Sequence, residues 1–247
     1  MHLEYKGASI VFSKIIDGYN QIFTSPVPET GQTIRKPLQL TSDPEQHWIP
    51  HISADGLKVV FTKPDPNSAG DVVCVISNAA AAAERCLDLS SSTPVLKGAN
   101  IWHASWTPTG MIVFEAWGGS LNSDEIVMVN EDGSALTQLT NNAGTKNYDE
   151  CPSVSSLDKT ELLVDTWNDQ TKHYEITSID LTTRQRHTIA GQDPRADSWD
   201  PLENYTYGTL WISQGPSDQS LEIHGMSFGP IQLTHNSYAD FFASSLH

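Results

Sequence analysis

Short apolar runs recur along the chain, and each follows directly after a polar turn. The repeat is about 50 residues long, with turns at Gly7, Gly56, Gly110, Lys159 and Gly208. The runs after the turns, such as residues 57–62, are rich in β-branched residues. Apolar runs of this length between turn-forming residues predict buried central strands.

Each repeat also contains further strands around the buried one. A second strand follows it, at residues 21–25, 71–76, 125–129, 174–179 and 221–225. A third ends in Gln-Leu-Thr at 39–41, 138–140 and 232–234, with weaker counterparts at 87–90 and 187–189. A fourth precedes the turns, at 49–56, 104–110, 151–158 and 201–208. Four short strands in each repeat are the content of one propeller blade.

The two ends of the chain are predicted to complete one blade together. Residues 242–247 resemble the strands that precede the other turns, and the next turn and strand fall within residues 2–13. This arrangement removes the open sheet edge between the first and the last blade. The sequence therefore predicts an all-β fold, in which residues 1–247 form a single five-bladed β-propeller of four-stranded antiparallel blades.

These motifs resemble the TolB-like (WD40-like) β-propeller repeat. The stretch from Glu125 to Thr140 has the family's order of an apolar strand, an Asp-Gly turn and then Gln-Leu-Thr. The same repeat is found in the propellers of prolyl oligopeptidase-like peptidases and of oligogalacturonate lyases. The resemblance implies a propeller fold, and function has to be argued from the site because one fold carries many functions.

The charge balance narrows the class of partner. The chain has 14 Lys and Arg against 30 Asp and Glu, which gives a formal net charge of -16. This excess disfavours nucleic acid and anionic membrane surfaces, although solubility alone also explains it. An apolar stretch long enough for membrane insertion is missing, and no signal peptide is predicted. Localisation stays open between the cytoplasm and export of a longer form.

The three cysteines predict neither a disulfide framework nor a zinc motif. Cys74, Cys86 and Cys151 are an odd number and lack Cys-x-x-Cys spacing. Cys74 lies within an alternating strand and is predicted to be a small core residue. A bridge between Cys74 and Cys86 within one hairpin is the alternative.

Side chains typical of a binding surface come just before each predicted inner strand. An aromatic residue stands beside a histidine or an acid in five places: His47-Trp48, Trp102-His103, Tyr148-Asp149-Glu150, Trp199-Asp200 and Asp240-Phe241. In a ring of blades these pairs fall in the connections between blades and point toward one rim of the channel. They suit a protein, a peptide or an oligosaccharide ligand. Packing between blades and capping of turns explain the same residues without a ligand.

Catalytic and metal-binding patterns are weaker. The Gly-x-Ser-x-Gly motif of α/β-hydrolases does not occur, and the candidate carboxylates for a glycosidase or lyase are Glu150 and Asp200. No metal or other cofactor is predicted, because His47 and His51 are too far apart along one extended strand to chelate one ion. A site built from several blades and a structural Ca²⁺ or Na⁺ ion are the alternatives. We therefore predict a non-catalytic binding or scaffold module, with a carbohydrate-active enzyme as the alternative.

Overall fold

The computed structural model describes residues 9–26, 37–66, 70–89, 94–154, 160–190, 198–204, 208–214, 221–226 and 230–232. These residues form five antiparallel sheets, four with four strands and one with three. The backbone alone is described from residue 190 onward. Within the described residues no helix is long and apolar enough to cross a bilayer.

The strands follow one another in chain order. The first sheet contains β1 (Ser9–Ile16), β2 (Tyr19–Pro26) and β3 (Leu38–Gln39). The second contains β4 (Trp48–Ile52), β5 (Lys58–Pro64), β6 (Asp71–Ser77) and β7 (Arg85–Cys86), followed by the short 3-10 helix η1 (Pro94–Leu96). The third contains β8 (Ala99–Trp106), β9 (Met111–Gly118), β10 (Glu125–Asn130) and β11 (Thr137–Gln138). The fourth contains β12 (Tyr148–Val154), β13 (Glu161–Asn168), β14 (His173–Asp180) and β15 (Arg186–Ala190). The fifth contains β16 (Ser198–Asn204), β17 (Gly208–Gln214), β18 (Leu221–Met226) and β19 (Pro230–Gln232).

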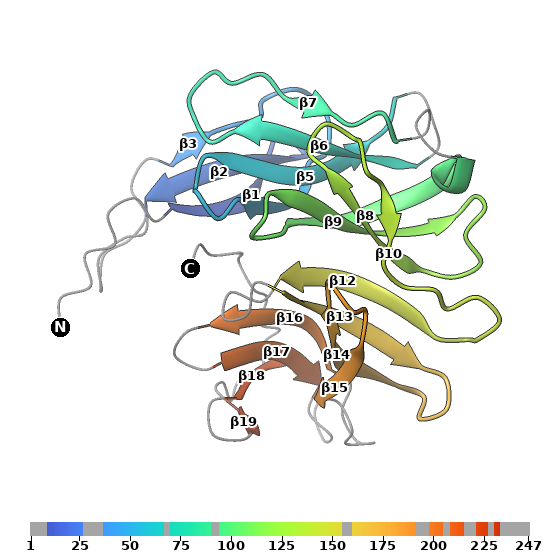
Figure 1. The fold of residues 1–247 in the computed structure, drawn as a ribbon. Coiled ribbons are helices and arrows are strands. Elements are labelled where there is room, and N and C mark those ends of the chain that lie inside the picture. Colours follow the sequence, from blue (N-terminus) through green and yellow to red (C-terminus); the bar gives the residue numbers. More distant parts are fainter. Residues whose placement is uncertain are drawn as a thin grey trace.

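The sheets are arranged as the blades of a propeller. Within each sheet the strands lie side by side in chain order, and the sheets succeed one another from the blue to the red end of the chain (Figure 1). The first strands β4, β8, β12 and β16 contact one another in that order, so they are the innermost strands. The predicted propeller architecture is confirmed. The blade number and the strand at 242–247 stay predictions, because residues 1–8 and 233–247 lie outside the described part.

The central strands are buried because neighbouring sheets cover both of their faces. Val59, Val60 and Phe61 on β5 are completely buried, and so are Ile112 and Val113 on β9. Apolar side chains of successive sheets form shared clusters, the largest of which joins the second sheet to the third. Burial on both faces explains why these strands have nearly continuous apolar runs rather than strict alternation.

The Gln-Leu-Thr signature fastens the outer edge of a sheet. In the first sheet the Ile22 N–H donates to Thr41 Oγ1 at 2.9 Å, and Leu40 N–H donates to the Ile22 carbonyl at 2.8 Å. Gln39 Nε2 donates to the Thr41 carbonyl at 2.8 Å. The third sheet repeats all three bonds with Ile126, Thr140, Leu139 and Gln138. The edge strands β3 and β11 have only two residues each. The bonds of the motif therefore continue the attachment of the chain to the sheet beyond these short strands.

A β-bulge interrupts each of the four described innermost strands. The register shifts between Trp48 and His51, Trp102 and Ser105, Glu150 and Ser153, and Trp199 and Leu202. In the first three bulges the first residue of the shifted segment has a positive φ. These residues are Ile49 at 48°, His103 at 46° and Cys151 at 50°. This left-handed backbone costs a residue with a side chain roughly 1–2 kcal/mol. The flanking pairs of the sheet hold the strained residue in place.

The bulges correct the predicted position of the aromatic and acidic pairs. Trp48, Trp102, Glu150 and Trp199 lie within the innermost strands, and not in connections between the blades. The prediction failed because the extra residue of the bulge breaks the alternation that marks a strand.

The prediction of Cys74 as an unbridged core residue was wrong. Its side chain is completely buried, as expected, but it forms a disulfide with Cys86. The two cysteines lie directly opposite each other on β6 and β7, which brings their Cα atoms to 3.9 Å. The bridge therefore ties the two-residue edge strand β7 to the sheet.

Substitutions at Ile49 test whether the bulge is strained. We expect Ile49→Gly to be more stable than Ile49→Ala by about 1 kcal/mol, because glycine adopts the left-handed backbone without a Cβ penalty. Urea denaturation of both variants measures this difference. Ile52, the last residue of the same strand, is the control, and there alanine should be the more stable substitute. If the alanine variant were the more stable one at position 49 as well as at position 52, the backbone at Ile49 would not be strained.

Candidate functional site

Five side chains with metal-binding or acid-base chemistry converge where the bulges of β8 and β12 meet. One ligand atom each from His103, Glu115 and Cys151 lies within 4.8 Å of the others. The same holds for Glu115, Asp124 and Glu150. Because Glu115 belongs to both groups, the five residues form one assembly, which we call the central cluster.

The bulges bring the central cluster together. His103 and Cys151 occupy the same left-handed position in neighbouring sheets, and His103 Nδ1 lies 3.1 Å from Cys151 Sγ. Glu115 projects from β9, where it pairs with Trp102 of β8. The Cys151 N–H points at Glu115 Oε2 from 3.4 Å. Two adjacent sheets therefore supply the cluster, with Asp124 added by the loop before β10.

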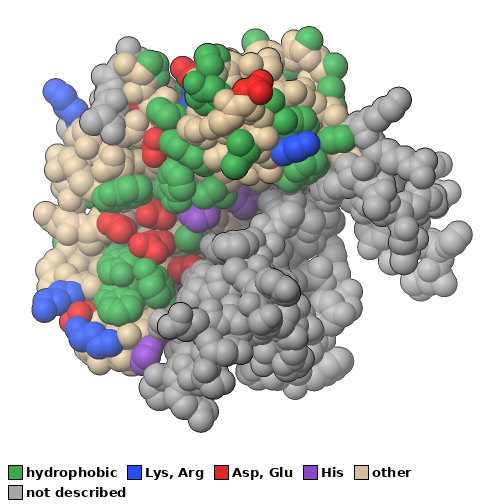
Figure 2. Space-filling view, turned by 180° about the vertical axis from the view of Figure 1, so that it is seen from behind, with side chains coloured by type: hydrophobic (Ala, Val, Ile, Leu, Met, Phe, Trp, Pro, Cys, Tyr) green, Lys and Arg blue, Asp and Glu red, His purple; other side chains and the backbone are tan. Residues whose placement is uncertain are grey.

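Three aromatic rings stand beside the carboxylates. Tyr148 stacks on Trp167 with 5.9 Å between the ring centres, and Tyr174 meets the edges of both rings. The Tyr174 hydroxyl donates to Glu150 Oε2 at 3.2 Å and lies 3.2 Å from the Tyr148 hydroxyl. We call these three residues the aromatic cluster. On one face of the molecule, acidic side chains gather between two apolar areas with histidines next to them (Figure 2).

A second aromatic contact adjoins the histidine. Trp48 and Trp102, from the innermost strands of neighbouring sheets, have ring centres 5.1 Å apart. Trp102 meets His103 edge to face at 6.3 Å. Both tryptophans are half-buried. Aromatic rings are therefore present beside the histidine as well as beside Glu150.

Burial sets the protonation of the cluster. Desolvation, followed by the charge of Glu150, raises the pKa of Glu115 to about 8, and burial also raises the pKa of Asp124. Burial lowers the pKa of His51 to about 4, and burial together with nearby His51 lowers the pKa of His103 to about 3. Both imidazoles are therefore neutral at pH 7, and Glu115 holds its proton.

Two residues expected at the rim are instead enclosed within the protein. His47 and Asp149 are completely buried, and each directly precedes a bulge. His47 packs on Phe61, and its Nε2 lies 3.3 Å from Asp43. Neither side chain is presented to a ligand, and both instead hold neighbouring segments together.

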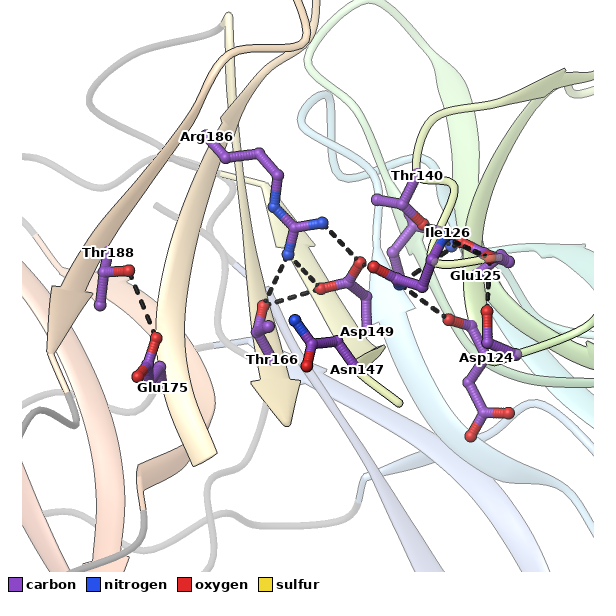
Figure 3. A network of polar contacts seen from close by, with 12 residues as sticks. Asp124, Glu125, Ile126, Thr140, Asn147, Asp149, Thr166, Glu175, Arg186 and Thr188 are labelled. Atoms are coloured by element: carbon purple, nitrogen blue, oxygen red, sulfur yellow. Dashed lines mark hydrogen bonds and ion pairs between the residues drawn. The ribbon is translucent and has the colours of Figure 1, made fainter. Parts of the chain in front are cut away.

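The contacts of Asp149 show this structural role (Figure 3). Its carboxylate accepts hydrogen bonds from Arg186 at 2.9 Å, Thr166 at 2.7 Å and Asn142 at 2.8 Å. The backbone N–H of Asn142 in turn donates to Glu125 on β10 at 2.7 Å. This network joins the third sheet to the fourth through buried polar groups, which are stabilising when every member is satisfied.

The structure brings together about half of the predicted site. Trp48, Trp102, His103, Tyr148 and Glu150 lie in or beside the central cluster, as the preceding contacts show. For Trp199 and Asp200 the backbone alone is described, and Asp240 and Phe241 lie outside the described residues.

Sequence reasoning did not place Glu115, Asp124, Cys151 or Tyr174 at the site. A signal was present for Glu115, because a carboxylate follows an uninterrupted apolar run at 111–114. Cys151 is equivalent to His103 once the repeats are aligned on their bulges. The sequence contains nothing that marks a bulge at these positions, so this alignment required the structure.

The ion pair between Asp149 and Arg186 can be tested by a double-mutant cycle. We expect Arg186→Met to destabilise the fold by about 2 kcal/mol, because it leaves a buried carboxylate without its cation. The double variant Asp149→Asn/Arg186→Met should be more stable than Arg186→Met alone, since the charge is then removed as well. Urea denaturation measures both. If the losses in the free energy of unfolding caused by the two single substitutions simply added up in the double variant, the buried ion pair would be ruled out.

Comparisons with known proteins agree on the fold. No protein-family model matches the chain, and no curated protein matches its sequence. TolB from Acinetobacter baumannii is similar in structure, with a TM-score of 0.65 and 12% identity over 92% of this chain and 53% of that one, so the chain spans about half of that protein. A chain of the nidogen/laminin complex is also similar in structure, with a TM-score of 0.62 and 11% identity over 94% of this chain and 80% of that one. An oligogalacturonate lyase from Vibrio parahaemolyticus has a TM-score of 0.58 and 13% identity over 92% of this chain and 63% of that one. The chain therefore has the fold of the TolB-like β-propellers.

Proposed function

We propose that the protein is a ligand-binding module that recognises a basic side chain of a protein or peptide. The observation that carries this proposal is the position of Glu150 beside the aromatic cluster, where the Tyr174 hydroxyl donates to its carboxylate. Asp124 and Glu115 have carboxylate oxygens within 4.8 Å of those of Glu150. An arginine or lysine head would gain an ion pair from the Glu150 carboxylate, hydrogen bonds to the oxygens of Glu115 and Asp124, and cation-π contact from the rings.

Charge and protonation favour a cation at this place. The chain has a formal net charge of -16, which steers basic partners toward it and repels acidic ones. Burial raises the pKa of Tyr148 and of Tyr174, so their phenols stay neutral and donate hydrogen bonds. A tyrosine that donates to a carboxylate holds it in position for an incoming cation.

Relatives of the fold support a protein partner. The nidogen structure is that of a complex with laminin, so a propeller of similar fold takes part in binding another protein. Aromatic residues such as those of the aromatic cluster are enriched at protein interfaces, where they supply large contact areas.

Peptides that differ only in one central residue test the proposal. We expect immobilised peptides with a central Arg or Lys to bind more tightly than matched peptides with Gln, and binding to weaken as salt is added. Glu150→Gln should reduce the affinity for the Arg peptides about tenfold, which corresponds to about 1.4 kcal/mol. Surface plasmon resonance measures both effects.

The matched control is Glu161→Gln, because Glu161 lies at the opposite end of β13 from Trp167. This variant also removes one carboxylate but should bind the Arg peptides like the unmodified protein. Equal affinity for the Arg and Gln peptides would overturn the proposal, as would equal losses in the two variants.

A carbohydrate-active enzyme is the second candidate. It is favoured by the carboxylates of Glu115 and Glu150, which lie within 4.8 Å of each other, close to the spacing of about 5 Å in retaining glycosidases. Aromatic rings such as Tyr148 and Trp167 also provide stacking surfaces for sugar rings. The other carboxylate that the sequence suggests for catalysis is Asp200.

Turnover assays decide between the two candidates. For an enzyme we expect new products when neutral and acidic oligosaccharides are incubated with the protein and analysed by mass spectrometry. Glu150→Gln should then abolish product formation while sugar binding is retained. Unchanged oligosaccharides after prolonged incubation would leave the binding module as the function.

A further inference from the structure

We propose that His103, Glu115 and Cys151 form a binding site for a zinc-type transition metal ion. This site goes beyond peptide recognition and is argued from other observations, and Glu115 is the one residue that the two proposals share. The three donors come from β8, β9 and β12, so two adjacent sheets would hold the ion between them.

The donor atoms are close enough to share one ion. The ligand atoms of His103, Glu115 and Cys151 lie within 4.8 Å of one another, and the nitrogen and sulfur are 3.1 Å apart. One nitrogen, one sulfur and one oxygen donor match a zinc site with three protein ligands and a fourth position open to water or substrate. Binding of the ion would displace the protons of Glu115 and Cys151. The resulting thiolate selects for zinc over magnesium, calcium or manganese, which prefer oxygen donors.

Strained backbone holds two of the donors in place. His103 and Cys151 both have a positive φ, of 46° and 50°, and both belong to bulges on innermost strands. Backbone strain of this kind concentrates at functional sites. The two side chains meet across the boundary between the sheets, with 3.1 Å between His103 Nδ1 and Cys151 Sγ.

Neighbouring groups also favour an ion. The Cys151 N–H is 3.4 Å from Glu115 Oε2 and orients the carboxylate, as outer-shell groups do around metal sites. Oxygen atoms of Asp124 and Glu150 lie within 4.8 Å of Glu115, which places further negative charge beside the proposed cation.

A second group of similar residues serves as a comparison. Asp43, His47 and Glu84 also have donor atoms within 4.8 Å of one another. The ammonium of Lys63 contacts Glu84 and lies 3.9 Å from Asp43, so a cation already occupies this group. We therefore expect no metal ion there.

Cobalt titration of the 247-residue chain tests the proposal. Chelator-treated protein, without reductant, should bind about one equivalent of Co²⁺ in calorimetry and develop thiolate-to-cobalt charge-transfer absorption. This absorption reports on one residue, because the chain has 3 cysteines and two of them form the disulfide. Zn²⁺ should displace the cobalt and remove the absorption.

Two variants and a control make the result specific. Cys151→Ser should abolish the charge-transfer absorption and weaken metal binding at least about tenfold. His103→Asn should weaken binding similarly, and asparagine tolerates the left-handed backbone at this position. Asp43→Asn should bind cobalt like the unmodified protein. Circular dichroism establishes that each variant is folded.

Several outcomes would overturn the metal site. These are the absence of charge-transfer absorption in the unmodified protein, its retention in folded Cys151→Ser, and its loss in Asp43→Asn. None of these results depends on whether Arg-containing peptides bind, so failure of the metal site and failure of the proposed function are distinguishable.

Discussion

The bulges of the innermost strands are the constraint on which the site depends. In a regular strand, successive side chains point to opposite faces, so inserting one residue changes which side chain faces the neighbouring sheet. Residues just before the bulges, such as His47 and Asp149, are buried within the protein. Residues inside the bulges, His103 and Cys151, meet each other. The sheet tolerates the strain of the left-handed backbone because ladder pairs continue on both sides.

The remainder of the structure supports these bulges in two ways. Apolar clusters shared between successive sheets provide most of the burial, which is the main favourable term in folding. Buried polar groups then fix how the sheets meet, as in the contacts from Arg186 through Asp149 and Asn142 to Glu125. The central cluster lies between the same two sheets, so this polar network helps to hold its geometry.

Most strands could be predicted because burial on both faces produces uninterrupted apolar runs. The strand predicted at 125–129, for example, is β10 (Glu125–Asn130). The bulges could not be predicted, because two of the three residues with a left-handed backbone, Ile49 and Cys151, are of types that rarely adopt it. Without the bulges, His103 and Cys151 could not be recognised as equivalent, and Glu115 could not be connected with them. The bridge between Cys74 and Cys86 likewise depends on the pairing of β6 with β7, which the spacing in the sequence left open.

The Gln-Leu-Thr bonds have a consequence for how such a chain evolves. In the first and third sheets the three bonds that the motif repeats begin and end within one sheet, whereas the contacts between sheets are mainly apolar and largely non-directional. A repeat closed by its own bonds can be duplicated or deleted without redesigning its neighbours. Gene rearrangement can therefore change the number of blades in such a propeller. A site shared by two sheets, in contrast, requires that these two sheets remain neighbours.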